Sequence, residues 1–244
     1  MWRDTITPMD ANELLKAAPE IRNIVGIIVG GIPVAEMIKS IVLPSTEVVG
    51  KRMANRVNRF FDKTGTMILD AGVSPQPVSD KIIVDIVRGV SLEDNEDLHT
   101  MWAALLANAA SAENAGKVKP GFIATLRQLS PDEASLLKRI YDHLQQTHGD
   151  DFSFPVPLSW LGRSYTELGF GEVIYQPDGA SIELSEFGRC LDSLEASQLI
   201  RRRFDLLNVE FSAIYNLPIG EPQYSLTHRG HQFVVVCQPP QPKK

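Results

Sequence analysis

The sequence predicts a mainly α protein, in which a helical N-terminal and middle region leads into a C-terminal winged-helix-like α+β domain. Apolar residues recur at helical spacing through most of residues 21–129, whereas short segments that alternate like strands come only after residue 150. The chain has 244 residues, 43% of them hydrophobic and 22% charged. This length and composition are typical of a globular protein with room for two modest domains.

The sequence predicts that the chain is organised in four consecutive segments. They are an apolar and basic amphipathic helical lead-in (1–74), a helical middle region (75–129), the winged-helix-like domain (130–238) and a disordered tail (239–244). The sequence SPQP around the first boundary is typical of a linker or tight bend.

The densest apolar stretch of the lead-in is residues 24–35. It is too short to cross a bilayer, which takes about twenty apolar residues. Gly30, Gly31 and Pro33 indicate a bend between two short helices. The N-terminal sequence MWRDTITPMD carries acids where a secretory signal carries bases, so no signal peptide is expected.

Residues 45–71 predict an amphipathic helix. Its apolar residues recur at helical spacing at Met53, Val57, Phe60, Thr64 and Ile68. Beside them runs what we call the basic stripe: Arg52, Arg56, Arg59 and Lys63. The stripe is either a solvated face or a contact with an anionic membrane surface, where each base contributes about 1 kcal/mol.

The middle region predicts two longer helices, over residues 78–90 and 98–110, and a short one that begins at Pro120. Ser91 is expected to cap the second helix, with Asp94 three residues on in a capping-box-like start. The acids of residues 93–97 favour a helix start over a metal-dependent nuclease site, because acids in a first turn stabilise the helix dipole.

From Ser130 the sequence predicts the order helix, strand, helix, helix, strands, helix. The first helix ends at Gly149, and a β-like piece follows at 152–158. Helices are then expected from Ser159 and from Ser185, strands at 201–209 and 211–217, and a last helix after residues 224–227. The helix after Ser185 carries more acids than bases, and the whole chain has a net charge of −6. Because acids repel phosphate, nucleic acid is not expected as a partner.

The chain lacks the common signatures of chemistry. It has neither a G-x-S-x-G turn nor a P-loop lysine after its glycines. His228 and His231 near Cys237 lack the paired spacing of a zinc site, so no metal, cofactor or catalytic residue is assigned. Cys190 and Cys237 lie among apolar neighbours and predict buried free thiols in a reducing cytoplasm.

Several pieces together resemble the abortive-infection alpha family of bacterial proteins. They are the acidic lead into LHTMWAALLANA, the segments FIATLRQLSPDEASLLKRI and LDSLEASQLIRR, and the closing YSLTHRGHQFVVVC. The resemblance covers most of residues 75–238 and implies a role in limiting phage infection at the cost of the host cell. It supplies no catalytic residues.

The first hypothesis is therefore a non-enzymatic defence protein of the cytoplasm. It would act through contacts with an unidentified protein partner and through peripheral association of its N-terminal helices with the inner face of the membrane. The alternative is a winged-helix DNA-binding transcriptional regulator, and a third hypothesis is an enzyme of unrecognised type. The sequence leaves open whether the protein forms a homo-oligomer.

Overall fold

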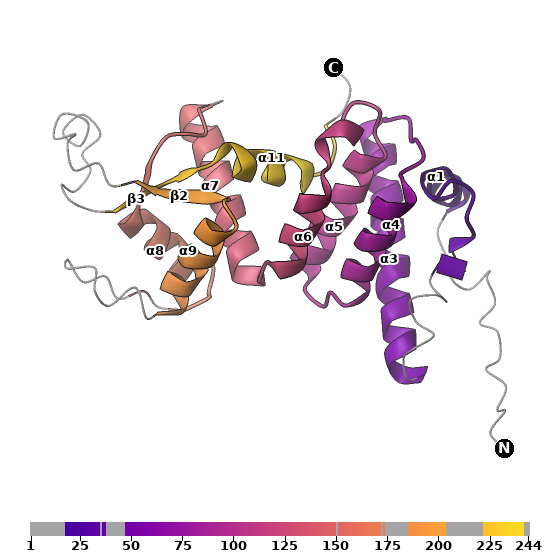
Figure 1. The fold of residues 1–244 in the computed structure, drawn as a ribbon, viewed down its shortest axis with the longest axis horizontal. Helices are drawn as coiled ribbons and strands as arrows, with labels where there is room; N and C mark the ends of the chain where they lie inside the picture. Colours follow the sequence, from indigo (N-terminus) through magenta and orange to yellow (C-terminus); the bar gives the residue numbers. More distant parts are fainter. Residues whose placement is uncertain are drawn as a thin grey trace. The chain divides into compact units, whose positions relative to one another are not determined.

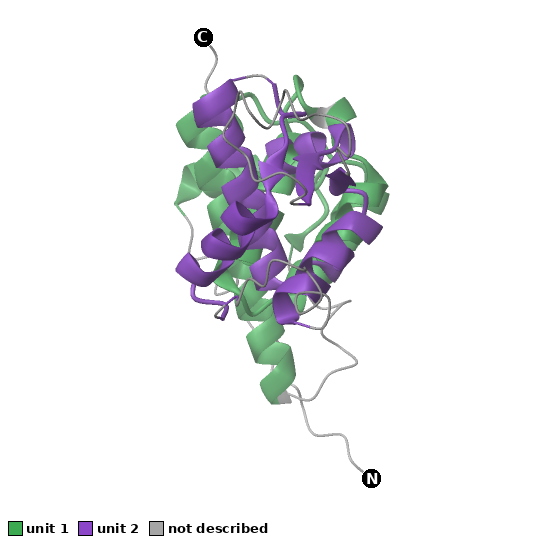
Figure 2. Cartoon of the chain, turned by 90° about the vertical axis from the view of Figure 1, so that its left-hand side faces the viewer, with its two compact units in different colours: residues 1–127, 236–244 green, residues 128–235 purple. Residues whose placement is uncertain are grey.

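The computed structural model of the chain describes residues 18–34, 36–37, 47–149, 151–171, 173, 185–203 and 222–241. The chain divides into two compact units (Figure 2). Unit 1 comprises Met1–Arg127 and Val236–Lys244, and unit 2 comprises Gln128–Val235. The predicted fold class is confirmed, since helices predominate and a small antiparallel sheet lies toward the C-terminus.

Unit 1 is helical in the part that the structure describes (Figure 1). Its elements are α1 (Pro19–Ile28), α3 (Glu47–Ala71), α4 (Asp80–Ser91), α5 (Glu96–Ala109), the 3₁₀ turn η1 (Ala115–Lys117) and α6 (Pro120–Gln128), whose last residue falls in unit 2. The long helix α3 contacts α1, α4 and α5, so it is the centre of the packing.

The predicted bend after the first helix is confirmed. Helix α1 ends at Ile28, and Gly30 and Gly31 follow with φ of 62° and 81°. Positive φ is accessible to glycine at little cost, so this pair turns the chain. Within the described ranges, no helix combines the length and the apolar character that a membrane crossing requires.

Helix α3 buries the predicted apolar stripe, all five members of which are at most 6% exposed: Met53, Val57, Phe60, Thr64 and Ile68. Helix α5 is buried on nearly all sides and places Trp102 against α4. A Cβ at Gly89 of α4 would lie 2.5 Å from the Trp102 ring. The close approach of α4 and α5 therefore depends on glycine at this position.

The predicted cap of α5 is wrong by four residues. Ser91 is the last residue of α4, and its hydroxyl donates to the carbonyl of Arg88. Asn95 caps α5 instead, because its side-chain oxygen accepts the backbone N–H groups of Asp97 and Leu98, each at 3.0 Å. Both residue types favour caps, so the local sequence does not separate them.

Unit 2 contains helices around a three-stranded sheet (Figure 1). Its elements are α7 (Pro131–His148), β1 (Val156–Pro157), α8 (Leu158–Glu167), α9 (Glu186–Ala196), β2 (Ile200–Arg203), β3 (Gln223–Leu226) and α11 (His228–Val236), whose last residue falls in unit 1. Strand β3 lies in the middle and pairs antiparallel with both neighbours, Tyr224 standing opposite Val156 on β1 and Arg202 on β2.

The helix starts of unit 2 agree with the predicted ones. Glu133 accepts the backbone N–H of Ser130 at 2.8 Å in a capping box, and α7 is followed by Gly149 with φ of 59°. The hydroxyl of Ser185 accepts from Gly188 at 3.0 Å and caps α9.

The strands of unit 2 differ from the predicted ones. The β-like piece predicted at 152–158 narrows to β1, and the segment expected only to lead into the last helix forms β3. All four residues of β3 are buried, so the alternation typical of strands is missing there. The predicted strand at 211–217 and residues 204–209 lie outside the described residues, as do residues 174–184 and residues 242–244 of the tail.

Candidate functional site

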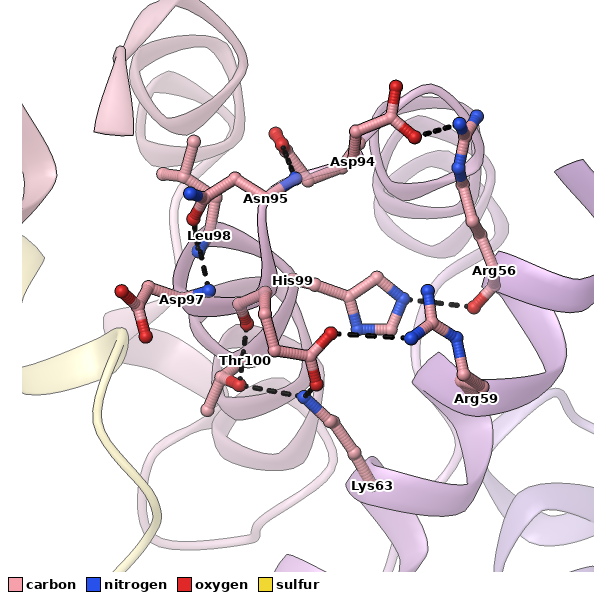
Figure 3. A network of polar contacts seen from close by, with 11 residues as sticks. Arg56, Arg59, Lys63, Asp94, Asn95, Asp97, Leu98, His99 and Thr100 are labelled. Carbon is pink, nitrogen blue, oxygen red and sulfur yellow. Dashed lines mark hydrogen bonds and ion pairs between the residues drawn. The ribbon is translucent and has the colours of Figure 1, made fainter. Parts of the chain in front are cut away.

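Three bases of the stripe, Arg56, Arg59 and Lys63, lie beside the start of α5 (Figure 3). Arg56 forms an ion pair with Asp94 and donates to the carbonyl of Ser91 at 3.1 Å. That carbonyl belongs to the last residue of α4, where helical carbonyls have no partner within the helix. Arg56 therefore joins α3 to the turn between α4 and α5.

The next two bases of the stripe share one carboxylate. Arg59 donates to one oxygen of Glu96 at 3.3 Å, and Lys63 donates to the other at 2.5 Å. Lys63 also donates to the hydroxyl of Thr100 at 2.8 Å. We call this set the α3–α5 polar network: Arg56, Arg59, Lys63, Asp94, Glu96, His99 and Thr100.

The N-terminal turn of α5 holds Glu96 in this position. Because Asn95 caps the helix, Glu96 is its first residue. Asp97 follows in the same turn and points away from the cations of α3 (Figure 3). It forms no ion pair with any residue that the structure describes. The acids of this turn thus have unequal roles, although each stabilises the helix dipole.

The four bases of the stripe lie in different environments. The side chain of Arg56 is 17% exposed, that of Lys63 28% and that of Arg59 55%. Arg52 is exposed and has no ion pair to a described residue. Arg56 is therefore held within the packing of unit 1, whereas Arg52 and Arg59 face solvent.

Glu96 is held in its charged form. The hydrogen bond from Lys63 lowers the pKa of its carboxyl below the ordinary value, and the charges of Lys63 and Arg59 lower it further. An ionised Glu96 offsets part of the positive charge of the stripe at neutral pH.

His99 is the buried member of the network and is 1% exposed. Its Nε2 is 3.0 Å from the carbonyl of Arg56, so Nε2 carries the hydrogen and donates. Its Nδ1 is buried and has no hydrogen-bond partner within the described part of the chain. Burial lowers the pKa of His99, with a smaller contribution from Lys63 and Arg59, and the ring is therefore neutral at pH 7.

Sequence reasoning did not single out His99 or Asn108, the two buried polar side chains of α5 with contacts to distant residues. The amide nitrogen of Asn108 donates to the carbonyls of Val236 and Gln238, at 3.0 and 2.8 Å. This attaches the returning C-terminal segment to α5. A lone polar residue on an otherwise apolar helix face was the available signal.

The residues considered as metal ligands have other contacts. His231 stacks against Phe152 with ring centroids 3.9 Å apart, and His228 lies 2.9 Å from the side chain of Gln232. Cys190 and Cys237 are buried free thiols, as predicted. In the described ranges, no three His, Cys, Asp or Glu side chains are grouped closely enough to hold a metal ion.

Comparison with known proteins adds one finding. A family model described as abortive infection alpha matches residues 46–237, a span that includes the α3–α5 polar network and the whole of unit 2. No curated protein and no solved structure gives a significant match.

Proposed function

Because the chain belongs to the abortive infection alpha family, we propose that it is a phage-defence protein that acts by binding and not by catalysis. Its α3 helix binds an anionic membrane surface peripherally, and its unit 2 binds a protein partner. The observation that carries this proposal is the exposed face of α3.

That face combines apolar and basic side chains. Val48 is 63% exposed and Val49 47%, and both flank the exposed Arg52. Residues of an α-helix follow at about 100°, so these three and Arg59 fall within an arc of about 100°. We call these four residues the exposed α3 surface. Helix α3 also extends past α4 and α5 at one end (Figure 1).

Such a surface has the chemistry of a helix that lies in a membrane interface. Each cation near an anionic leaflet contributes about 1 kcal/mol, so Arg52 and Arg59 together contribute about 2 kcal/mol. Partial burial of two valines adds about 1 kcal/mol each. The sum gives weak, reversible and salt-sensitive binding, which suits a protein that must leave growing cells unharmed.

The proposed role of unit 2 rests on its topology and charge. We propose that unit 2 is a winged helix, which is supported by its order of helix, strand, two helices and two strands, with the last strand in the middle of the sheet. In DNA-binding members of that fold, the helix equivalent to α9 enters the major groove. Here that helix carries Glu186, Asp192 and Glu195 against one base, Arg189, which is itself paired with Glu186.

Acids at this position repel phosphate, so we favour a protein partner over nucleic acid. The alternative of a DNA-binding regulator gains no support from α9.

The test is flotation of the purified protein with vesicles of phosphatidylglycerol and phosphatidylcholine, and with vesicles of phosphatidylcholine alone. The double variant Arg52→Gln/Arg59→Gln should bind the anionic vesicles about 30-fold less well, at about fivefold for each cation. The matched control is Lys81→Gln/Arg88→Gln, which removes two exposed bases from α4.

The proposed membrane contact would be contradicted if both double variants lost the same amount of vesicle binding. It would also be contradicted if replacing Arg52 and Arg59 left vesicle binding unchanged. The same two variants should then be compared in cells challenged with phage. We expect protection to fall for the α3 variant and to persist for the α4 variant, while both proteins keep the wild-type melting temperature.

A further inference from the structure

The arrangement of Glu96 points to regulation of the same surface, and this inference rests on the membrane contact proposed above. We infer that Glu96 is an internal competitor of lipid phosphate: it occupies Arg59 and Lys63, and these cations become fully available only when an anionic surface displaces it. Helix α5 thereby sets the threshold of charge density at which α3 binds.

The geometry carries this inference in two ways. Glu96 contacts both cations at once, one with each carboxylate oxygen, at 3.3 and 2.5 Å. Its side chain is nevertheless 61% exposed, so it can rotate into solvent without opening the core. A phosphate group presents the same kind of anionic oxygens to the same two cations.

The neighbouring contacts stay in place during such an exchange. Arg56 remains joined to the carbonyl of Ser91, and His99 remains joined to the carbonyl of Arg56. The packing of α3 against α5 therefore does not depend on Glu96. The exchange is local and involves one side chain.

The strengths of the two competing contacts are comparable. An exposed ion pair contributes a factor of roughly 1.4 to 5 in an equilibrium constant. A cation at an anionic leaflet contributes a factor of about five. A membrane rich in anionic lipid can therefore displace Glu96, whereas a neutral one cannot.

The experiment compares Glu96→Gln with Asp97→Asn in flotation with phosphatidylglycerol vesicles at several anionic fractions. The two variants remove one charge each from the same turn of α5, but Asp97 points away from the cations (Figure 3). We expect Glu96→Gln to bind about 2- to 25-fold more tightly than Asp97→Asn, because it releases two exposed ion pairs, and to do so at a lower anionic fraction. Adding Arg59→Gln and Lys63→Gln to Glu96→Gln should remove the gain.

A fourth variant controls for effects of net charge and of helix stability. Glu96→Asp keeps the charge and the helix dipole but withdraws the carboxylate by one methylene, so its binding should also exceed that of the wild type. If Glu96→Gln and Asp97→Asn bind equally well while wild-type binding still depends on Arg52, Glu96 does not compete with lipid phosphate. The proposed function would remain intact in that case. Failure of every variant and of the wild type to bind would overturn both.

Discussion

Arg56 should be required for stability, unlike its neighbour Arg52 in the same stripe. Arg56→Gln removes the hydrogen bond to the carbonyl of Ser91 and the ion pair with Asp94, because the glutamine is shorter and uncharged. A hydrogen bond from a charged donor contributes about 1.5–3 kcal/mol. The ion pair adds at most about 1 kcal/mol, since the Asp94 side chain is 81% exposed.

We therefore expect Arg56→Gln to lower the free energy of unfolding of unit 1 by about 2–3 kcal/mol. Arg52→Gln should change it by less than about 0.5 kcal/mol, as is usual for exposed sites. The assay is urea unfolding followed by tryptophan fluorescence in a Trp2→Phe/Trp160→Phe background, which leaves Trp102 as the one tryptophan and so reports on unit 1. Equal stability of the two variants would show that Arg56 does not join α4 to α3. If the prediction holds, replacing the whole stripe at once would mix loss of folding with loss of surface binding.

Two further predictions concern the core of unit 1. Trp102→Ala should cost about 3–5 kcal/mol as a large cavity and leave little folded protein, which soluble expression and melting would reveal; normal melting would place Trp102 outside the core. The pKa of His99 is lower in the folded than in the unfolded chain, so the unfolded chain takes up a proton first as the pH falls. Stability should be full above about pH 6.5 and fall below it by up to about 1.4 kcal/mol per pH unit. Urea unfolding at pH 7.5 and 5.5 should show that His99→Gln reduces this difference, and an unchanged difference would assign the pH effect to other groups.

The helices of unit 1 were predictable because their apolar residues follow one period through long segments. The stripe from Met53 to Ile68 is an example, since helical spacing alone places all its members on one face. Strand β3 was not predictable in this way. It has four residues, all buried, and so lacks both the length and the alternation that indicate a strand.

The bases of the candidate site were predictable from the sequence, but their acidic partners were not. Spacing along α3 placed the four bases on one face, but their acidic partners lie 33–38 residues further along the chain. Which acid meets which base depends on the packing of α3 against α5, and that is a tertiary property. The cap of α5 also depends on tertiary packing. Arg56 of α3 donates to the carbonyl of Ser91 and so stabilises Ser91 as the last residue of α4, which leaves Asn95 to cap α5.

The contacts of Asn108 have a consequence for how the protein is made. Unit 1 is discontinuous in sequence. The side-chain amide of Asn108 on α5 donates to the carbonyls of Val236 and Gln238, which follow the whole of unit 2 in the chain. While the ribosome is still synthesising unit 2, the bundle of unit 1 lacks its last segment and a buried amide lacks two acceptors. Unit 1 therefore completes its folding only after residues 236–238 emerge, and any break in the chain within unit 2 separates unit 1 into two fragments.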